Sequence, residues 1–258
     1  MALRDERGRR IVVGAGDPNP VVSIAITTEP TNTQYAHNPL DLTGLVIKAT
    51  KRDGTKETVT DKAICNREVW GNAVETVVTF GYHEKACYWT VTPTAVIPAS
   101  MTVKTAPTKT AYKYGDSISL AGAVLEVTYN DSHKAEVAGT SESVSVSPTT
   151  MGSDTASVTI TYTEGETSVT ATQAVTLIEP ESASVKTPAT KLTYHADDEL
   201  DMTGLTLEIT YSDESTATVS TGFTGSPTTI LAGTTEITVT YTEGNVSVTT
   251  GYEITVTE

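Results

Sequence analysis

Apolar and polar residues alternate one by one along several short stretches of this chain. Residues 158–162 read Val-Thr-Ile-Thr-Tyr and residues 237–241 read Ile-Thr-Val-Thr-Tyr. A period of two is typical of a β-strand with one buried and one solvent-facing side. Each stretch continues through Thr-Glu-Gly into a second alternating run, which predicts a β-hairpin. Thr makes up about a fifth of the chain, which also favours strands.

The pattern occurs three times. Each copy opens with a Thr-rich segment that ends in tyrosine, at Tyr35, Tyr112 and Tyr194. A motif such as Leu-Asp-Leu-Thr-Gly follows and ends at Gly44, Gly122 and Gly204, 78 and then 82 residues apart. This period is too long for a solenoid and suits a small β-sandwich domain. We therefore predict an arm at residues 1–20 and domains at residues 21–95, 96–178 and 179–258.

These motifs resemble those of the bacterial immunoglobulin-like (Ig-like) domain of group 3. The likeness rests on Pro-Thr-x-Thr-x-Tyr, Leu-x-Leu-x-Gly-Leu, a strand ending in x-Asp-Gly, and Val-Thr-Val-Thr-Tyr, and it extends over residues 21–258. It implies an all-β fold, with three tandem Ig-like β-sandwich domains behind an extended N-terminal arm. Such domains occur in bacterial surface proteins, in secreted enzymes as accessory domains and in tailed-phage virion proteins. The resemblance therefore predicts the fold more firmly than the function.

The net charge of −15 is unevenly distributed. Residues 1–20 carry +1 and residues 21–95 carry −1, whereas residues 96–178 carry −4 and residues 179–258 carry −11. An acidic surface repels nucleic acid and anionic membranes, so we expect neither as a partner. Solubility alone would also account for this charge. No apolar stretch has the length of a signal peptide or a membrane span, so membrane insertion is not expected.

Residues 1–20 have the composition of a linker without a core of its own. Four arginines precede one apolar trio and then a stretch rich in Gly and Pro. Arginine pairs well with carboxylates, and a short apolar strand can add to a partner's sheet or groove. We therefore predict that the arm binds a partner through Arg4, Arg7, Arg9, Arg10, Ile11, Val12 and Val13.

The first copy differs in composition from the other two. It holds both tryptophans, Trp70 and Trp89, and both cysteines, Cys65 and Cys87. Because aromatic residues concentrate at interfaces, we predict Trp70 and Trp89 as docking residues; the alternative is that both rings fill a variant core. The other copies carry valine where Cys87 stands. We expect a buried, reduced thiol there, with a Cys65–Cys87 disulfide as the alternative.

The sequence shows no catalytic or cofactor motif. None of the four histidines has a zinc-binding spacing, and no phosphate-binding or nucleophile motif occurs. We expect neither an enzyme nor a cofactor. Calcium is an alternative at the densest acidic cluster, Asp197, Asp198, Glu199 and Asp201, but the other copies form this turn without it, which favours a solvated turn. The Thr and Ser runs are typical of exposed strand faces.

Two classes of function fit these observations. In the first, the chain is a capsid decoration or head-fibre protein on the virion surface of a tailed phage. Its arm and first copy would bind the capsid or another virion protein. Its outer domains would touch host surface glycans weakly, and many chains on one particle would add avidity. Such a protein leaves the cell by lysis and needs no signal peptide. In the second, the chain is a spacer or adhesion segment of a bacterial cell-surface protein.

Overall fold

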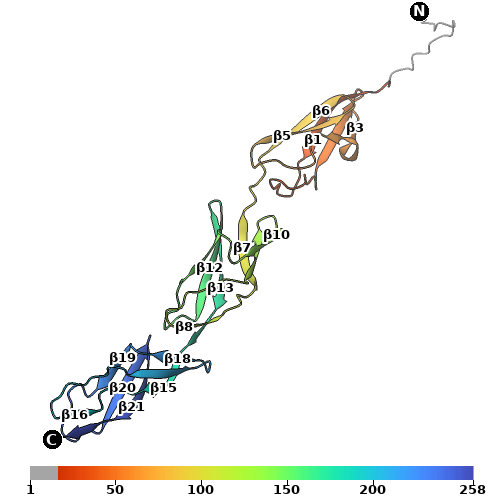
Figure 1. The fold of residues 1–258 in the computed structure, drawn as a ribbon. Coiled ribbons are helices and arrows are strands. Elements are labelled where there is room, and N and C mark those ends of the chain that lie inside the picture. The colour runs from red at the N-terminus through yellow and green to blue at the C-terminus, as the bar shows by residue number, and fades with distance from the viewer. Residues whose placement is uncertain (1–16, 258) are drawn as a thin grey trace, which may run out of the picture. The chain divides into compact units, whose positions relative to one another are not determined.

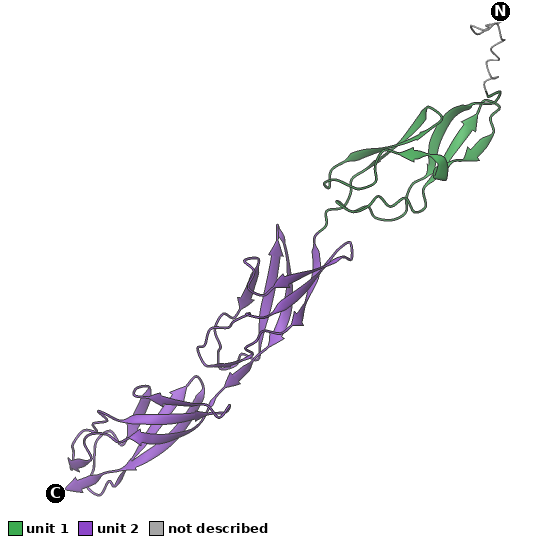
Figure 2. Cartoon of the chain, turned by 45° about the vertical axis from the view of Figure 1, so that its right-hand side comes forward, with its two compact units in different colours: residues 1–96 green, residues 97–258 purple. Residues whose placement is uncertain are grey.

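The computed structural model describes residues 17–257, and these residues form mainly strands and connecting loops (Figure 1). The chain divides into two compact units, residues 1–96 and residues 97–258 (Figure 2). The first unit contains one β-sandwich, the first domain. The second unit contains two, the second and third domains. No helix within the described part of the chain is long and apolar enough to cross a membrane.

The first domain packs two three-stranded antiparallel sheets. One sheet consists of β1 (Val21–Thr28), β2 (Val46–Lys51) and β3 (Lys56–Thr58). The other consists of β4 (Ile64–Cys65), β5 (Thr76–Tyr82) and β6 (Lys85–Val91), and the 3-10 turn Thr60–Lys62 precedes it. Ile47 of β2 and Val78 of β5 are fully buried in one shared apolar core. The two sheets therefore enclose that core.

The second domain has the same arrangement. One sheet has the order β10 (Lys134–Ala138), β9 (Val124–Tyr129), β7 (Pro98–Thr105). The other has the order β11 (Val144–Ser147), β12 (Ser157–Glu164), β13 (Thr167–Ala174). β8 (Ala111–Lys113) pairs in parallel with β14 (Thr176–Ile178). Along β12, Val158 and Ile160 are buried and Thr159 is exposed, as the alternating sequence predicts.

The third domain repeats the pattern once more. Its sheets have the orders β15 (Pro180–Thr187), β17 (Thr206–Tyr211), β18 (Thr216–Val219) and β19 (Phe223–Ser226), β20 (Glu236–Glu243), β21 (Val246–Glu253). β16 (Thr193–His195) pairs in parallel with β22 (Thr255–Thr257). The predicted all-β fold of tandem sandwiches is confirmed.

A polar side chain ties the opening segment of each domain to its glycine-containing turn. In the third domain the Tyr194 hydroxyl lies 3.2 Å from the Lys191 carbonyl oxygen and 3.0 Å from that of Asp201, and the Asp201 amide donates back to it. Tyr112 makes the same set of bonds in the second domain. These hydroxyls satisfy backbone groups that the turn would otherwise leave unpaired.

In the first domain Gln34 takes this place, not Tyr35. The Gln34 Nε2 donates to the Asp41 carbonyl at 2.8 Å, and its Oε1 accepts from the Asp41 amide at 3.1 Å. Gln34 stands ten residues before Gly44, as Tyr112 does before Gly122. The sequence match of Tyr35 with Tyr112 is therefore wrong by one position. The amide of Gln34 offers a donor and an acceptor, so it can replace the tyrosine hydroxyl.

The backbone conformation explains why glycine ends each of these turns. Gly122 has φ +79°, and a Cβ there would lie 2.6 Å from the Thr108 Cγ2. Left-handed backbone and close approach both favour glycine. Gly44 and Gly204 have the same conformation and approach the matching threonines Thr31 and Thr190. The glycines that marked the repeat in the sequence thus mark one conserved turn in the fold.

Candidate docking face on the first domain

The outward side of the β4–β5–β6 sheet is uncharged and partly apolar. Cross-strand partners on this side are Val77 with Thr90, Thr79 with Tyr88, Gly81 with Ala86, and Ile64 of β4 with Gly81. The intervening residues point inward and are buried, among them Val78, Phe80, Cys87 and Trp89. Three outward side chains are large, apolar or aromatic and exposed: Ile64 (78%), Tyr88 (66%) and Val77 (51%). We call this side the outer face of the first domain.

The other two domains carry mainly hydroxyl groups at the same positions. Phe80 pairs with Cys87 as Tyr162 pairs with Val169 and Tyr241 with Val248, which fixes the correspondence. On this basis the pairs in the second domain are Thr159 with Thr172, Thr161 with Thr170, and Thr163 with Ser168. In the third they are Thr238 with Gly251, Thr240 with Thr249, and Thr242 with Ser247. The scaffold therefore folds without the exposed Ile64, Val77 and Tyr88.

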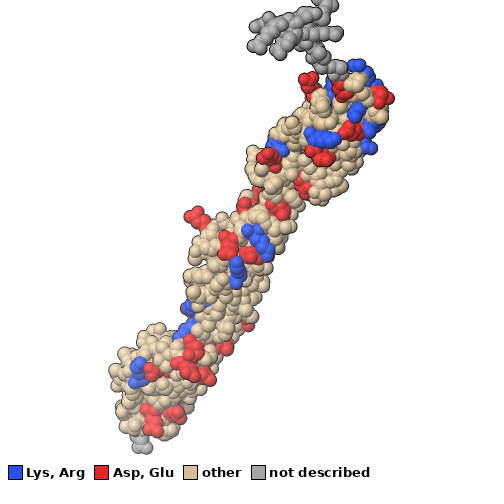
Figure 3. Space-filling model, turned by 90° about the vertical axis from the view of Figure 1, so that its right-hand side faces the viewer, with Lys and Arg blue, Asp and Glu red and all other residues tan. Residues whose placement is uncertain are grey.

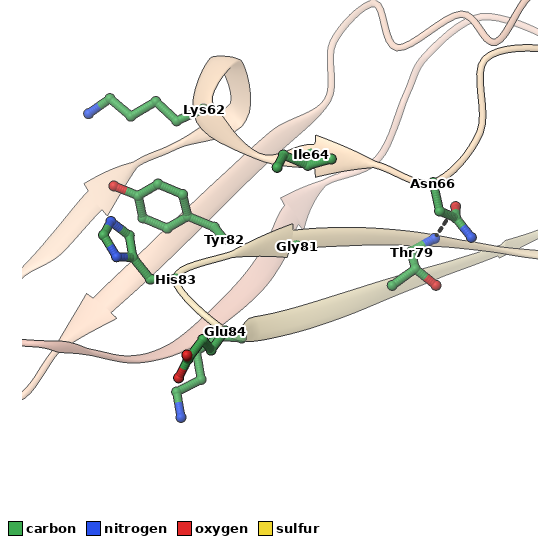
Figure 4. Close-up of a pocket in the computed structure, with 9 residues that line it drawn as sticks. Lys62, Ile64, Asn66, Thr79, Gly81, Tyr82, His83 and Glu84 are labelled. Carbon is green, nitrogen blue, oxygen red and sulfur yellow. Dashed lines mark hydrogen bonds between the residues drawn. The ribbon is translucent and has the colours of Figure 1, made fainter.

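Gly81 leaves a hollow in the outer face. The hollow has a volume of about 420 Å³ (Figure 4). Its lining combines Ile64, Thr79, Gly81 and Tyr82 with the polar or charged side chains of Lys62, Asn66, His83, Glu84 and Lys85. A Cβ on Gly81 would meet nothing closer than the Ile64 carbonyl oxygen at 3.9 Å and the Lys85 carbonyl oxygen at 4.0 Å. The second and third domains have threonine here, at Thr163 and Thr242. The space is therefore specific to the first domain.

Hydrogen bonds and an ion pair hold the rim of the hollow. The Thr79 amide donates to Asn66 Oδ1 at 2.9 Å, as Figure 4 shows. Lys62 donates to Glu57 at 2.6 Å, and this bond lowers the pKa of the Glu57 carboxyl. In the space-filling view, Lys and Arg side chains are intermixed with acidic ones on the first domain, whereas the charged groups of the third domain are mainly acidic (Figure 3).

Both tryptophans belong to the core. Trp70 is 2% exposed and Trp89 is 5% exposed, and their ring centroids lie 6.0 Å apart in an edge-on arrangement. The Trp70 Nε1 donates to Gln34 Oε1 at 2.9 Å, so the indole N–H is satisfied inside the domain. The structure thus places both predicted docking residues as the core-filling alternative describes. Neither ring is on the surface, where a partner would contact it.

The docking residues predicted from the sequence did not include Ile64, Gly81 or Tyr88, which lie on the outer face. Tyr88 and Trp89 are neighbours in the sequence, and in a strand neighbours point to opposite sides. The valine pattern matched to Cys87 already indicated that Cys87 points inward, and with it Trp89. Because neighbouring residues of a strand point to opposite sides, an inward Cys87 and Trp89 place Tyr88 on the outward side of the sheet.

The two cysteines are free. Cys65 and Cys87 both pair with Phe80, one from each neighbouring strand. Two strands that flank a third lie about 9–10 Å apart, which is too far for a disulfide. Burial raises the pKa of the Cys87 thiol. Cys87 is thus the buried, reduced thiol that was expected.

The acidic cluster of the third domain is engaged in its own turn. Asp198 accepts from Lys191 Nζ at 2.9 Å and from the His195 amide at 3.1 Å, and the bond from Lys191 lowers the pKa of Asp198. The amide of Thr203 donates to Asp201 at 2.9 Å. Within residues 17–257 no group of three or more His, Cys, Asp and Glu side chains is arranged to hold a metal ion. These bonds favour the solvated-turn interpretation over calcium.

The docking residues predicted in the arm lie outside the described residues. They are Arg4, Arg7, Arg9, Arg10, Ile11, Val12 and Val13.

The second domain has counterparts among known families. Residues 105–176 match the family model of the bacterial Ig-like domain (group 3). This part of the chain is similar to bacterial Ig-like domains of that group. Ig-like domains are consistent with a structural or adhesive segment and are generally non-catalytic.

Solved structures also resemble the chain, at low identity. The S-layer protein rSbsC(31-844) is 14% identical with a TM-score of 0.27, and the match covers 92% of this chain and 37% of that one. The I9–I11 tandem from titin is 11% identical with a TM-score of 0.31, and the match covers 91% and 99%. The chain thus spans about 37% of the S-layer structure. No curated protein matches it. Likeness at this level says nothing about function.

Proposed function

We propose that this chain is a non-enzymatic structural protein that attaches to an assembly through its arm and first domain and presents two further Ig-like domains. The observation that carries the proposal is the contrast between equivalent faces. Val77 and Tyr88 are exposed on the first domain where the second domain carries Thr159 and Thr170, and Ile64 is exposed beside them. Large exposed apolar groups that the fold does not need are typical of interaction surfaces.

The assembly that we propose is the capsid of a tailed phage, with the chain as a decoration or head-fibre protein. The charge supports this division of roles, since residues 1–20 carry +1 and residues 179–258 carry −11. Four arginines in the arm are suited to carboxylates on a virion protein. The strongly acidic third domain favours solvent over close packing against such a surface. Buried in the core, Trp70 and Trp89 support the attachment only by holding the first domain together.

The second and third domains would act by presentation. Their outward sheet faces carry rows of Thr and Ser, for example Thr161 beside Thr170. Such hydroxyl rows allow weak contact with host surface glycans, and many copies on one particle would add avidity. We therefore propose the virion surface as the location of the chain.

Deleting residues 1–20 tests the attachment. We expect the variant to lose its place on particles, because the arginines and the apolar trio go with it, while all three domains stay folded. The melting temperature of the first domain should fall slightly, because the Arg52 amide loses its bond to the Pro20 carbonyl and the Asp53 amide loses its bond to Asn19 Oδ1. Particle occupancy measured by quantitative gel analysis of purified virions is the readout. A matched variant, Thr161→Ala on the second domain, should keep wild-type occupancy. Unchanged occupancy after the deletion would contradict the proposal.

A spacer segment of a bacterial surface protein is the second candidate. Paired hydrogen bonds at the start of each of the two later domains favour this candidate. In the third domain the Ser212 amide donates to the Glu179 carbonyl, and the Glu179 amide donates to Ser212 Oγ. Asn130 and Ile97 form the matching pair at the start of the second domain. Short connecting segments that are held by hydrogen bonds are suited to a spacer. Binding to cell envelopes without binding to particles would favour this candidate over the first.

A further inference from the structure

The second and third domains share the short strand that joins them. In β14 the side chain of Leu177 packs on the core of the second domain, whereas that of Ile178 packs on the core of the third. Only Glu179 separates β14 from β15, and it exchanges two hydrogen bonds with Ser212 of the third domain. Both domains belong to one compact unit, residues 97–258. The junction therefore leaves little free chain between the two cores.

A lysine of the second domain lies on a tyrosine of the third. Lys113 is the strand partner of Ile178 at the end of β8, and its Nζ lies 3.2 Å from the centroid of the Tyr211 ring. The negative face of an aromatic ring attracts an ammonium group in this position. The side chain of Lys113 therefore contributes to a contact between domains.

The second domain covers the matching ring with a side chain of its own. Tyr129 corresponds to Tyr211, and His133 stacks on it with the ring centroids 4.2 Å apart. The third domain has Ser215 at the place of His133, because the amides of Tyr129 and Tyr211 donate to the carbonyls of these two residues. A serine side chain is too small to cover a ring. The face of Tyr211 is thus left for Lys113.

The β20–β21 turn of the third domain also touches the second domain. A Cβ on Gly244 would lie 2.8 Å from Tyr114 Cδ2 and 2.6 Å from Ser153 Oγ. Gly165 is the counterpart of Gly244 in the second domain, with φ +58° against +59°, yet a Cβ there would meet nothing within 4 Å. The two turns therefore have the same backbone at this glycine and differ in the close approach of a neighbouring domain.

We propose that Lys113, Tyr114 and Ile178 form an interface of the second domain whose partner is the third domain, so that the two domains stabilise each other. The apolar surface of Ile178 and the charge of Lys113 both find their partners across the junction. This interface belongs to the chain alone. It goes beyond the proposed attachment and is the same under either candidate function, so particle occupancy is not its measurement.

Lys113→Ala tests the coupling, because it changes one domain and is measured in the other. The slowest amides of the third domain should exchange about fivefold faster, since they exchange through opening of the whole domain and the closed form has lost a cation–π contact. Hydrogen exchange of the full-length chain, followed by mass spectrometry of peptides from each domain, provides the measurement. Lys134→Ala is the matched control, because Lys134 bonds to Glu126 of its own domain. It should leave the third domain unchanged.

Gly244→Asn tests the contact of the turn. Asparagine accepts left-handed backbone, so its side chain should push against Tyr114 with little strain in the turn itself. The face of the Tyr211 ring shifts the ε-methylene protons of Lys113 upfield in an NMR spectrum, and this signal is assigned by its absence in Lys113→Ala. Gly244→Asn should remove most of the shift. Gly165→Asn, with the same backbone and open space, should leave it in place.

Two results would overturn the proposal. The first is unchanged exchange of the third domain in Lys113→Ala. The second is a Lys113 signal without an upfield shift in the wild-type chain, because the lysine would then not lie on the Tyr211 ring. Faster exchange of the third domain in Lys113→Ala but not in Lys134→Ala, with a shifted Lys113 signal that Gly244→Asn returns and Gly165→Asn does not, supports the interface.

Discussion

The first domain and its two successors solve the same structural problem with different residues. In the third domain Tyr211 and Tyr241 both donate to one oxygen of Glu243, at 2.9 and 2.7 Å. Tyr129, Tyr162 and Glu164 form the same cluster in the second domain. By strand register, the first domain has Lys51, Phe80 and Tyr82 at these positions.

The comparison of the three domains shows which features the fold requires and which positions can vary. The glycine turn and the buried polar anchor persist in all three domains, although Gln34 replaces tyrosine in the first. The tyrosine–glutamate cluster and the hydroxyl-rich outer face do not persist. The first domain has thus kept the turn and core architecture while changing its outer face. A surface that changes while its support stays constant is a good candidate for a distinct role.

The largest expected effect is a loss of stability on substitution of the buried Trp89, compared with its exposed neighbour Tyr88. Trp89→Thr introduces the residue that the third domain carries at the matching position, Thr250, but it leaves a cavity next to Trp70. We expect a loss of about 3–5 kcal/mol in the free energy of unfolding of the first domain. Domain-resolved hydrogen exchange during denaturation measures it.

Tyr88→Thr is the matched control, one residue away and 66% exposed. It should change the stability by less than about 0.5 kcal/mol. If both substitutions cost the same, the division into an inner and an outer side would be wrong.

The glycine turn should be equally sensitive in every domain. Gly122→Ala forces a Cβ into left-handed backbone at 2.6 Å from Thr108 Cγ2. We expect a loss of about 2 kcal/mol in the second domain. Gly44→Ala should cost a similar amount in the first domain, where the Cβ would lie 2.9 Å from Thr31 Cγ2. Chemical denaturation of the two variants compares them, and a first domain that tolerates the change would show that its turn has also diverged.

The tyrosine–glutamate cluster should stabilise only the domains that contain it. Tyr211→Phe removes one hydrogen bond to Glu243 and should cost the third domain about 1 kcal/mol. Tyr82→Phe alters the position in the first domain that corresponds to Glu243, where no such cluster exists, and should cost less. Denaturant titration followed by tyrosine fluorescence provides the measurement. Equal losses would mean that the cluster contributes nothing beyond packing.

The smallest effect is a pH dependence that differs between domains. Burial, and then the bond to Glu243, raise the pKa of Tyr211 above its ordinary value of about 10. The folded state therefore holds this proton more tightly than the unfolded state. The contribution is fully present below about pH 10 and is lost as the pH rises above that value. Melting curves at pH 9 and pH 11 should show a larger loss for the third domain in the wild-type chain than in Tyr211→Phe. Equal losses would refute the linkage.

The sequence by itself determined the strands, the repeat and the charge gradient. Strict alternation at 158–162 is enough to predict β12, because a half-buried strand has a period of two. The glycines marked the shared turn, because no other residue fits its backbone. These features depend on local geometry, which nearby residues encode.

Only the tertiary structure decided which residues belong together on a surface. Shifting a strand by one residue exchanges its two sides, so composition alone treated Trp89 as a surface anchor although Tyr88 is the exposed one. Gln34 became the equivalent of Tyr112 through its bonds to a backbone seven residues away, which no residue match revealed. The hollow exists because β4 brings Ile64 beside Gly81, seventeen positions later in the chain. Such contacts depend on strand register and packing, which follow from the whole fold.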